Sequence, residues 1–216
     1  MSKIALKFCG VQSLEDLQVV SDSIAQYIGF IFAESKRKVN PHLVGQWLKE
    51  VNTKKKVVAV FVNPTLEEIH SVLKHVPVDV IQFHGNETIE QIAQVRETYP
   101  GFIWKALHHH DHTLEEMEKY IELVDGFVVD SRTKDQWGGT GVSFDWDAVP
   151  VYLEFAEKHN KICFIAGGVN EENISNLLNY HPQAIDLSSG IEVDRKKSKE
   201  KILLIEERVL QHEHIS

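Results

Sequence analysis

Residues 163–170 read Cys-Phe-Ile-Ala-Gly-Gly-Val-Asn and residues 184–190 read Ala-Ile-Asp-Leu-Ser-Ser-Gly, with a polar segment between the two runs. In each run a short apolar strand ends in small residues, and a segment with helical spacing can follow. Glycine at such a turn lets a ligand approach the backbone, and the exposed N–H groups favour an anion. The stretch therefore indicates two successive strand–helix units whose strand ends suit an anion.

The same pattern of strand and helix extends through the rest of the chain. Strands are expected at Ile4–Phe8, Tyr27–Phe32, Val57–Val62, Val78–Phe83, Phe102–Leu107, Val124–Asp130, Ile162–Ala166 and Ala184–Leu187. Helices are expected at Ser13–Ala25, Pro41–Val51, Leu66–His75, Ile89–Thr98, Leu114–Ile121, Trp146–His159, Glu171–Leu178 and Lys199–Val209. This alternation predicts an α/β protein with a closed (β/α)8 TIM barrel as a single domain over residues 1–216. An open doubly wound sheet is the alternative, but the small and regular period favours closure.

The turns after the seventh and eighth strands of a (β/α)8 barrel commonly hold a phosphate. In this chain those turns contain Gly167 and Gly168, and then Ser188, Ser189 and Gly190. We expect them to form a phosphate site together. The alternative is that the glycines only permit tight turns.

Composition excludes several classes of function. The formal net charge is −9, so no basic surplus exists to neutralise a nucleic acid, although local N–H groups and an arginine still suit a small anion. The two cysteines are too few for a disulfide scaffold. The sequence has neither a signal-type apolar segment at its start nor an apolar run of about 20 residues, so we expect no membrane span. A cytoplasmic enzyme or binding domain fits best.

Two titratable residues stand at predicted strand ends, where barrel enzymes place their catalytic groups. They are Cys9 on the first strand and Asp130 on the sixth. Strand alternation directs Lys7 and Cys9 into the barrel, with Asp186 or Asp130 as the partner that a buried lysine needs. A cation close to Cys9 would favour the thiolate. The alternative to a catalytic role is that Cys9 is only a small buried residue and that Asp130 is only a helix cap or a loop carboxylate.

Four other features carry less specific signals. Arg37 lies in Glu-Ser-Lys-Arg-Lys, residues 34–38, which suits either capture of a substrate carboxylate or a solvated surface run. His84 ends the fourth strand and is expected to orient neighbouring groups. Residues 108–112 read His-His-His-Asp-His, and we expect a solvated loop there because adjacent histidines rarely converge on one metal. The long polar segment after the sixth strand, residues 131–145, includes Gly141 and is expected to be functional.

Taken together, the strand ends resemble those of phosphoribosylanthranilate isomerase. The matching pieces are Lys-Phe-Cys-Gly (7–10), Gly-Phe-Ile-Phe (29–32) with Ser-Lys-Arg (35–37), Val-Phe-Val-Asn (60–63), Gln-Phe-His-Gly-Asn-Glu (82–87), Gly-Gly-Thr-Gly (138–141) with Phe-Asp-Trp (144–146), Ala-Gly-Gly-Val-Asn (166–170) and Asp-Leu-Ser-Ser-Gly-Ile-Glu (186–192). The resemblance covers almost the whole chain in the right order. It is specific as a set, although no single piece would be.

The resemblance implies an isomerase of tryptophan biosynthesis that performs an Amadori rearrangement of N-(5-phosphoribosyl)anthranilate. It assigns Cys9 as general base, Asp130 as general acid, and Arg37 as the residue that meets the anthranilate carboxylate. The candidate substrate-binding residues are Arg37, His84, Gly141, Gly167, Gly168, Ser188, Ser189 and Gly190. No metal or organic cofactor is expected, and the only partner is the phosphoribosyl substrate, bound by a monomer or a homodimer.

The chain departs from the family pattern at Gln12, at Val142 and in residues 193–197. These changes leave the acid, the base and the phosphate turns in place. One rival function is another sugar-phosphate barrel enzyme, such as indole-glycerol-phosphate synthase or the histidine-pathway Amadori isomerase. The histidine-pathway enzyme would be expected to carry an aspartate where this chain has Cys9. A second rival is a non-catalytic barrel that binds a phosphorylated metabolite, which would have no use for the pair Cys9 and Asp130.

Overall fold

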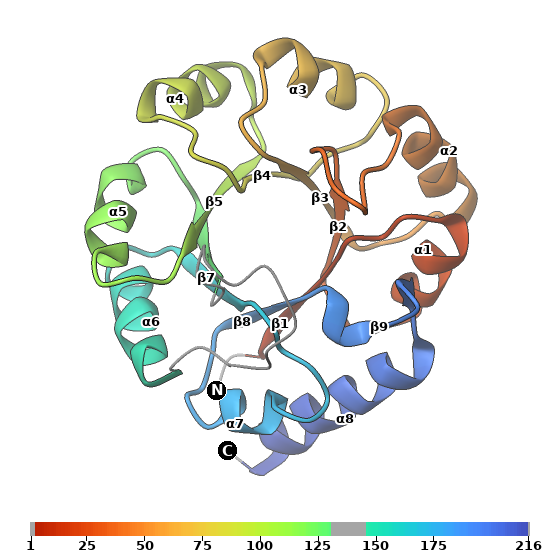
Figure 1. Ribbon diagram of the computed structural model, residues 1–216, viewed down its shortest axis with the longest axis vertical. Coiled ribbons are helices and arrows are strands. Elements are labelled where there is room, and N and C mark those ends of the chain that lie inside the picture. Colours follow the sequence, from red (N-terminus) through yellow and green to blue (C-terminus); the bar gives the residue numbers. More distant parts are fainter. Residues whose placement is uncertain (1–2, 131–145, 216) are drawn as a thin grey trace.

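Eight parallel strands form a closed barrel in chain order, with β1 (Ala5–Cys9) paired to β8 (Ala184–Leu187) across the closure. The computed structural model describes residues 3–130 and 146–215. Figure 1 shows the helices as a ring around the strands, and α7 and α8 lie side by side near the C-terminus. The predicted (β/α)8 barrel is confirmed, and the open sheet is excluded.

The elements alternate along the chain as expected. The strands are β1 Ala5–Cys9, β2 Tyr27–Ile31, β3 Lys56–Phe61, β4 Val80–Phe83, β5 Phe102–His108, β6 Gly126–Asp130, β7 Ile162–Ala166 and β8 Ala184–Leu187. The helices are α1 Leu14–Ser21, α2 Pro41–Val51, α3 Leu66–Leu73, α4 Ile89–Thr98, α5 Thr113–Tyr120, α6 Val149–Lys158, α7 Ile174–Leu178 and α8 Lys199–Ile215. Short 3-10 turns, η1 Trp146–Ala148 and η2 Ser189–Ile191, precede α6 and follow β8.

Several helices begin at side chains that satisfy their first backbone N–H groups. Thr65 and Thr88 each form a capping box with the residue three positions later, Glu68 and Gln91 respectively. Ser13 accepts a hydrogen bond from the amide of Asp16 at the start of α1. These local signals fix where α1, α3 and α4 start and therefore how long the loops before them are.

Strand alternation divides the apolar side chains into two layers. On β1, Leu6 and Phe8 pack outward against the helices, whereas Cys9 belongs to the inner cluster of the barrel. The inner cluster has fewer residues than the outer layer. Its buried members are Cys9, Val58, Val60, Val80, Trp104, Ala106, Val128, Phe164, Ala166 and Ala184. The rings of Trp104 and Phe164, whose centroids are 4.5 Å apart, belong to this layer. The barrel interior is thus a packed core, with its functional side chains at the carboxyl ends of the strands.

Several helix boundaries differ from the sequence-based expectation, since α1 ends at Ser21 and α8 extends to Ile215, and one element was not expected. The helix α7 begins at Ile174 rather than Glu171, because Asn170 Oδ1 accepts from the amides of Glu172 and Asn173 and holds these residues in a turn. A short hairpin, β9 Glu192–Val193 and β10 Lys196–Lys197, follows η2 and was not expected. Its turn places two residues that are not glycine at positive φ, so it lacks the usual sequence signal of such a hairpin.

Candidate active site

Lys7 and Cys9 point into the barrel from β1, as the alternation predicts. In the β1–β8 pairing Lys7 lies opposite Asp186, and its Nζ is 2.7 Å from the Asp186 Oδ2. The Lys7 side chain is fully buried and that of Asp186 is 8% exposed, so the ion pair lies almost entirely out of water. The expected carboxylate partner of Lys7 is therefore Asp186, and the pair lies one inward-facing position below Cys9.

The environment of Cys9 does not favour the thiolate in the way the sequence suggests. Burial raises the pKa of the Cys9 thiol, and the charges of Lys7 and Lys197 oppose that rise only in part. Asp186 adds to the rise, because its negative charge disfavours a nearby thiolate. The expected lowering of this pKa by a neighbouring cation is present, from Lys7 and Lys197, but it does not set the net direction. Desolvation is the larger effect.

Two glycines make room around the end of β1. Gly29 is the register partner of Cys9 on β2, and a Cβ there would lie 2.7 Å from the Cys9 Sγ. Gly10 has a φ of +77°, and a Cβ on it would lie 2.7 Å from Arg37 Cδ. The first glycine leaves space for the thiol, and the second lets the arginine lie across the end of β1.

Asp130 ends β6 at the same mouth of the barrel, with its side chain 14% exposed. Its Oδ2 lies 3.7 Å from Nε2 of His84, which follows β4. The amide Nε2 of Gln82, which can only donate, lies 3.1 Å from His84 Nδ1, and His84 Nε2 faces Asp130. The expectation that His84 orients a neighbouring group agrees with this arrangement.

Glu87 fixes the loop that carries His84. Its carboxylate accepts hydrogen bonds from the backbone amides of Asn63 at 2.8 Å and Gly85 at 3.0 Å. It also forms a buried ion pair with Lys105, at 3.0 Å. Glu87 is therefore a structural residue that ties the loops after β3 and β4 to the middle of β5.

The turns after β7 and β8 lie against each other. Gly167 and Gly168 both have positive φ, of 90° and 70°, and a Cβ on Gly168 would point into open space. A Cβ on Gly190, in contrast, would lie 1.9 Å from the carbonyl oxygen of Val169. Gly190 is thus required for the packing of the two turns, whereas the space beside Gly168 is open.

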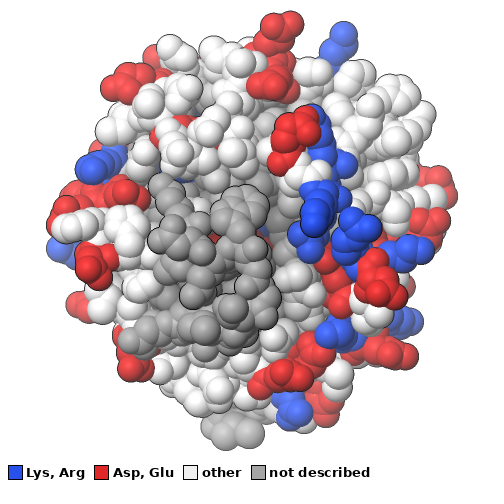
Figure 2. Space-filling view, viewed as in Figure 1, with Lys and Arg blue, Asp and Glu red and all other residues white. Residues whose placement is uncertain are grey.

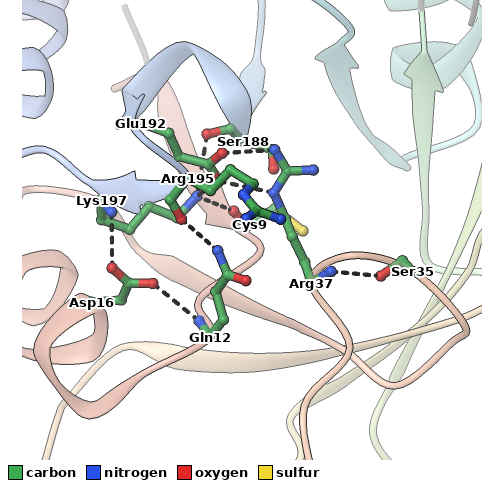
Figure 3. A network of polar contacts seen from close by, with 9 residues as sticks. All are labelled: Cys9, Gln12, Asp16, Ser35, Arg37, Ser188, Glu192, Arg195 and Lys197. Atoms are coloured by element: carbon green, nitrogen blue, oxygen red, sulfur yellow. Dashed lines mark hydrogen bonds and ion pairs between the residues drawn. The ribbon is translucent and has the colours of Figure 1, made fainter.

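Arg37 is part of a buried polar network rather than a solvated run, with its side chain 26% exposed (Figure 3). Its Nε and Nη2 donate to the two carboxylate oxygens of Glu192, at 3.0 and 2.6 Å. Glu192 also pairs with the fully buried Lys197, at 2.8 Å. Sequence reasoning did not assign a role to Glu192 or Lys197, because both belong to the hairpin that it did not predict.

A basic rim, defined here as the exposed Lys36, Lys38, Arg195 and Lys196, borders this side of the mouth. Figure 2 shows Lys and Arg side chains gathered to the right of the centre, where Figure 1 places the loop after β2 and the β9–β10 hairpin. The chain as a whole is acidic, with a net charge of −9, so this rim is a local exception. It favours an anionic ligand.

The remaining sequence predictions concern metal sites, membranes and the long loop. In residues 3–130 and 146–215 no group of three or more His, Cys, Asp or Glu is placed to hold a metal. Within the 108–112 tract, His109 Nδ1 lies 2.7 Å from the Tyr152 hydroxyl and His112 pairs with Glu115. Gly141 lies outside the described residues. None of the described helices has both the length and the apolar character needed to cross a membrane.

Three comparisons relate this barrel to known proteins. A family model described as N-(5'-phosphoribosyl)anthranilate (PRA) isomerase matches residues 6–208. The chain is 49% identical over 213 residues to N-(5'-phosphoribosyl)anthranilate isomerase of Geobacillus thermodenitrificans, covering 98% of this chain and 96% of the relative. The family match runs from the second residue of β1 through β8.

Solved structures agree with this relation. The structure of monomers generated from the dimeric phosphoribosylanthranilate isomerase of Thermotoga maritima superposes with a TM-score of 0.78 at 27% identity, over 96% of this chain and 98% of that one. A phosphoribosylanthranilate isomerase in complex with reduced 1-(o-carboxyphenylamino)-1-deoxyribulose 5-phosphate gives a TM-score of 0.79 at 27% identity, over 96% and 99%. Fold, strand-end residues and full-length similarity lead to one conclusion: the chain belongs to the N-(5'-phosphoribosyl)anthranilate isomerase family.

Proposed function

We propose that this chain converts N-(5'-phosphoribosyl)anthranilate to 1-(2-carboxyphenylamino)-1-deoxyribulose 5-phosphate in tryptophan biosynthesis, with Cys9 as general base and Asp130 as general acid. The observation that carries the proposal is the placement of a thiol on β1 and a carboxyl on β6 at one barrel mouth, in a chain of this family. An Amadori rearrangement needs one group to give a proton and another to take one.

The reaction divides into two proton transfers and a tautomerisation. Asp130 gives a proton to the ribose ring oxygen as the bond from that oxygen to C1 breaks, and the anthranilate nitrogen supplies the electrons for an iminium. Cys9, as the thiolate, removes the C2 proton, and the electrons of that bond neutralise the iminium to give an enolamine. The enolamine becomes the ketone when C1 gains a proton and the C2 hydroxyl loses one. Proton exchange with water restores Asp130 and Cys9.

The other candidate residues fit binding and orientation in this scheme. Arg37 would meet the anthranilate carboxylate, and the turns with Gly167, Gly168 and residues 188–190 would hold the phosphate through backbone N–H groups. His84, 3.7 Å from Asp130, would orient the acid. Gly141 is proposed as a further contact to the substrate.

The substrate supplies its own electron sink, the iminium nitrogen, so the proposed scheme requires neither a metal nor an organic cofactor. The oligomeric state proposed is a monomer or a homodimer, and the Thermotoga maritima relative described as dimeric is the support for the second. We place the enzyme in the cytoplasm, because Cys9 and Cys163 are both free thiols.

Fluorescence of the anthranilate group provides the test. The purified chain is mixed with N-(5'-phosphoribosyl)anthranilate, the decay of fluorescence is followed, and the product is identified by mass and NMR. We expect turnover to the ketose at catalytic amounts of enzyme. A chain that binds the reduced product analogue but does not convert substrate would be a non-catalytic binder. Conversion of the histidine-pathway substrate alone would favour that rival enzyme.

A further inference from the structure

We propose that Glu192, anchored by the buried Lys197, is a positioning residue that orients the Arg37 guanidinium toward the carboxylate of the substrate. This inference rests on the proposed function, in which the substrate carries an aromatic carboxylate beside the reacting sugar. It assigns a purpose to the β9–β10 hairpin, from which both Glu192 and Lys197 come.

The contacts form a chain from the hairpin to the mouth of the barrel (Figure 3). Lys197 Nζ donates to Glu192 Oε1 at 2.8 Å and to the carbonyl oxygen of Cys9 at 2.6 Å. It also lies 3.2 Å from the carbonyl oxygen of Ser188. One fully buried ammonium therefore fixes the Glu192 carboxylate to the ends of both β1 and β8.

Glu192 binds only one edge of the Arg37 guanidinium, and the other edge can bind a second carboxylate. Arginine has five N–H donors in one plane. Glu192 takes Nε and one hydrogen of Nη2, the side edge of the fork. In residues 3–130 and 146–215 no hydrogen bond is present at Nη1. The end edge, Nη1 and the other hydrogen of Nη2, can thus bind a second carboxylate with two parallel hydrogen bonds.

Charge and burial keep this arrangement in place. Although burial disfavours its charged form, hydrogen bonds from Arg37 and the charge of Lys197 hold the pKa of Glu192 below its ordinary value. Glu192 therefore stays ionised, and one carboxylate faces two cations. Burial lowers the pKa of Lys197 while Glu192 acts to raise it, and the single charge of Glu192 is shared between two basic groups, so Arg37 keeps positive charge for an anion.

The place at which Arg37 is held is next to the proposed base. Because Gly10 has no Cβ, Arg37 can lie across the end of β1, where Figure 3 shows it beside Cys9. A carboxylate bound to the end edge of the guanidinium would bring the attached anthranilate, and with it the sugar carbons, to the mouth near the thiol. The orientation of Arg37 would thus determine how the substrate lies relative to Cys9.

The test is a double-mutant cycle on ligand binding with Glu192→Gln, Arg37→Ala and the double variant. The probes are reduced 1-(o-carboxyphenylamino)-1-deoxyribulose 5-phosphate and the same compound without the carboxylate. Glu192→Gln keeps the shape of the side chain and removes its charge. We expect it to weaken binding of the carboxylated probe roughly tenfold, the effect of one charged hydrogen bond, and to raise KM more than it lowers kcat. Binding of the probe without the carboxylate should be unchanged.

The cycle separates positioning from mere support of the fold. In the Arg37→Ala background, Glu192→Gln should cause no further loss for the carboxylated probe, because its effect passes through Arg37. An equal loss in both backgrounds, an equal loss for both probes, or parental affinity would overturn the inference. If Glu192→Gln does not fold, Glu192→Asp, which keeps the charge and withdraws the carboxylate, is measured in the same cycle with the same expectations. A parent chain that neither binds nor converts substrate would overturn the proposed function as well.

Discussion

Lys7 and Asp186 face each other across the β1–β8 pair inside the barrel, with 2.7 Å between Nζ and Oδ2. Burial acts to lower the pKa of Lys7, but the Asp186 carboxylate and Cys9 outweigh that effect and raise it, so the lysine remains charged. The pair lies where β1 and β8 close the barrel, and it places a cation near the thiol. It therefore bears on both stability and chemistry.

Removing one member of this pair should destabilise the fold strongly. In Lys7→Met the Asp186 carboxylate is left buried without its partner, which typically costs about 3–5 kcal/mol in the free energy of unfolding. The double variant Lys7→Met/Asp186→Leu removes both charges and should recover most of that loss. Denaturant unfolding measures both. A single variant as stable as the parent would show that the pair contributes little.

The pH dependence of kcat/KM should reflect the buried thiol. The base acts only when deprotonated, so kcat/KM rises as pH passes upward through the pKa of Cys9 in the free enzyme. Because burial raises that pKa, the rising limb should lie above the ordinary thiol value of about 8.5. It should not centre on neutrality. A limb well below the ordinary thiol value would contradict the assignment of burial as the main effect.

Gly168 and Gly190 should respond differently to the same substitution. In Gly168→Ala the new methyl enters open space at positive φ, so we expect a raised KM with a stability loss of only about 1 kcal/mol. In Gly190→Ala the methyl would lie 1.9 Å from Val169 O, so the turns must separate and stability should fall further. Steady-state kinetics and thermal melting of both variants check this. Unchanged KM in a folded Gly168→Ala would remove that turn from the phosphate site.

Activity should not depend on a metal. The purified enzyme is dialysed against a strong chelator and assayed with and without added zinc, and we expect the same turnover throughout, because the iminium already accepts the electrons. Loss of activity that zinc restores would instead indicate a metal site, with the His108–His112 tract as the first place to look.

The sequence predicts best what depends on local periodicity. Strand alternation alone predicts that Lys7, Cys9 and Asp186 point into the barrel. Successive side chains of a strand point to opposite faces, so when the apolar neighbours pack against the helices these residues must point inward. The contact of Arg37 with Glu192 spans 155 positions and depends on a hairpin turn without glycine, so no local signal announces it.

The direction of the Cys9 pKa could not be predicted for a different reason. It is a balance between burial and the charges of Lys7, Asp186 and Lys197, and only the folded structure gives the distances and the depth. The start of α7 was missed because Asn170 competes for the backbone through its own side chain.

The most direct test of the account is the turnover of Cys9→Ser and Asp130→Asn in the fluorescence assay, with Cys163→Ala as the control. Cys163 is a fully buried thiol on the outward face of β7, where burial raises its pKa to about 12, so its loss should not affect chemistry. Thermal melting establishes that all three variants are folded. We predict that kcat falls on the order of 10²–10⁴-fold in Cys9→Ser and in Asp130→Asn, and stays near the parental value in Cys163→Ala. Near-parental turnover in a folded Cys9→Ser or Asp130→Asn would contradict the acid–base pair.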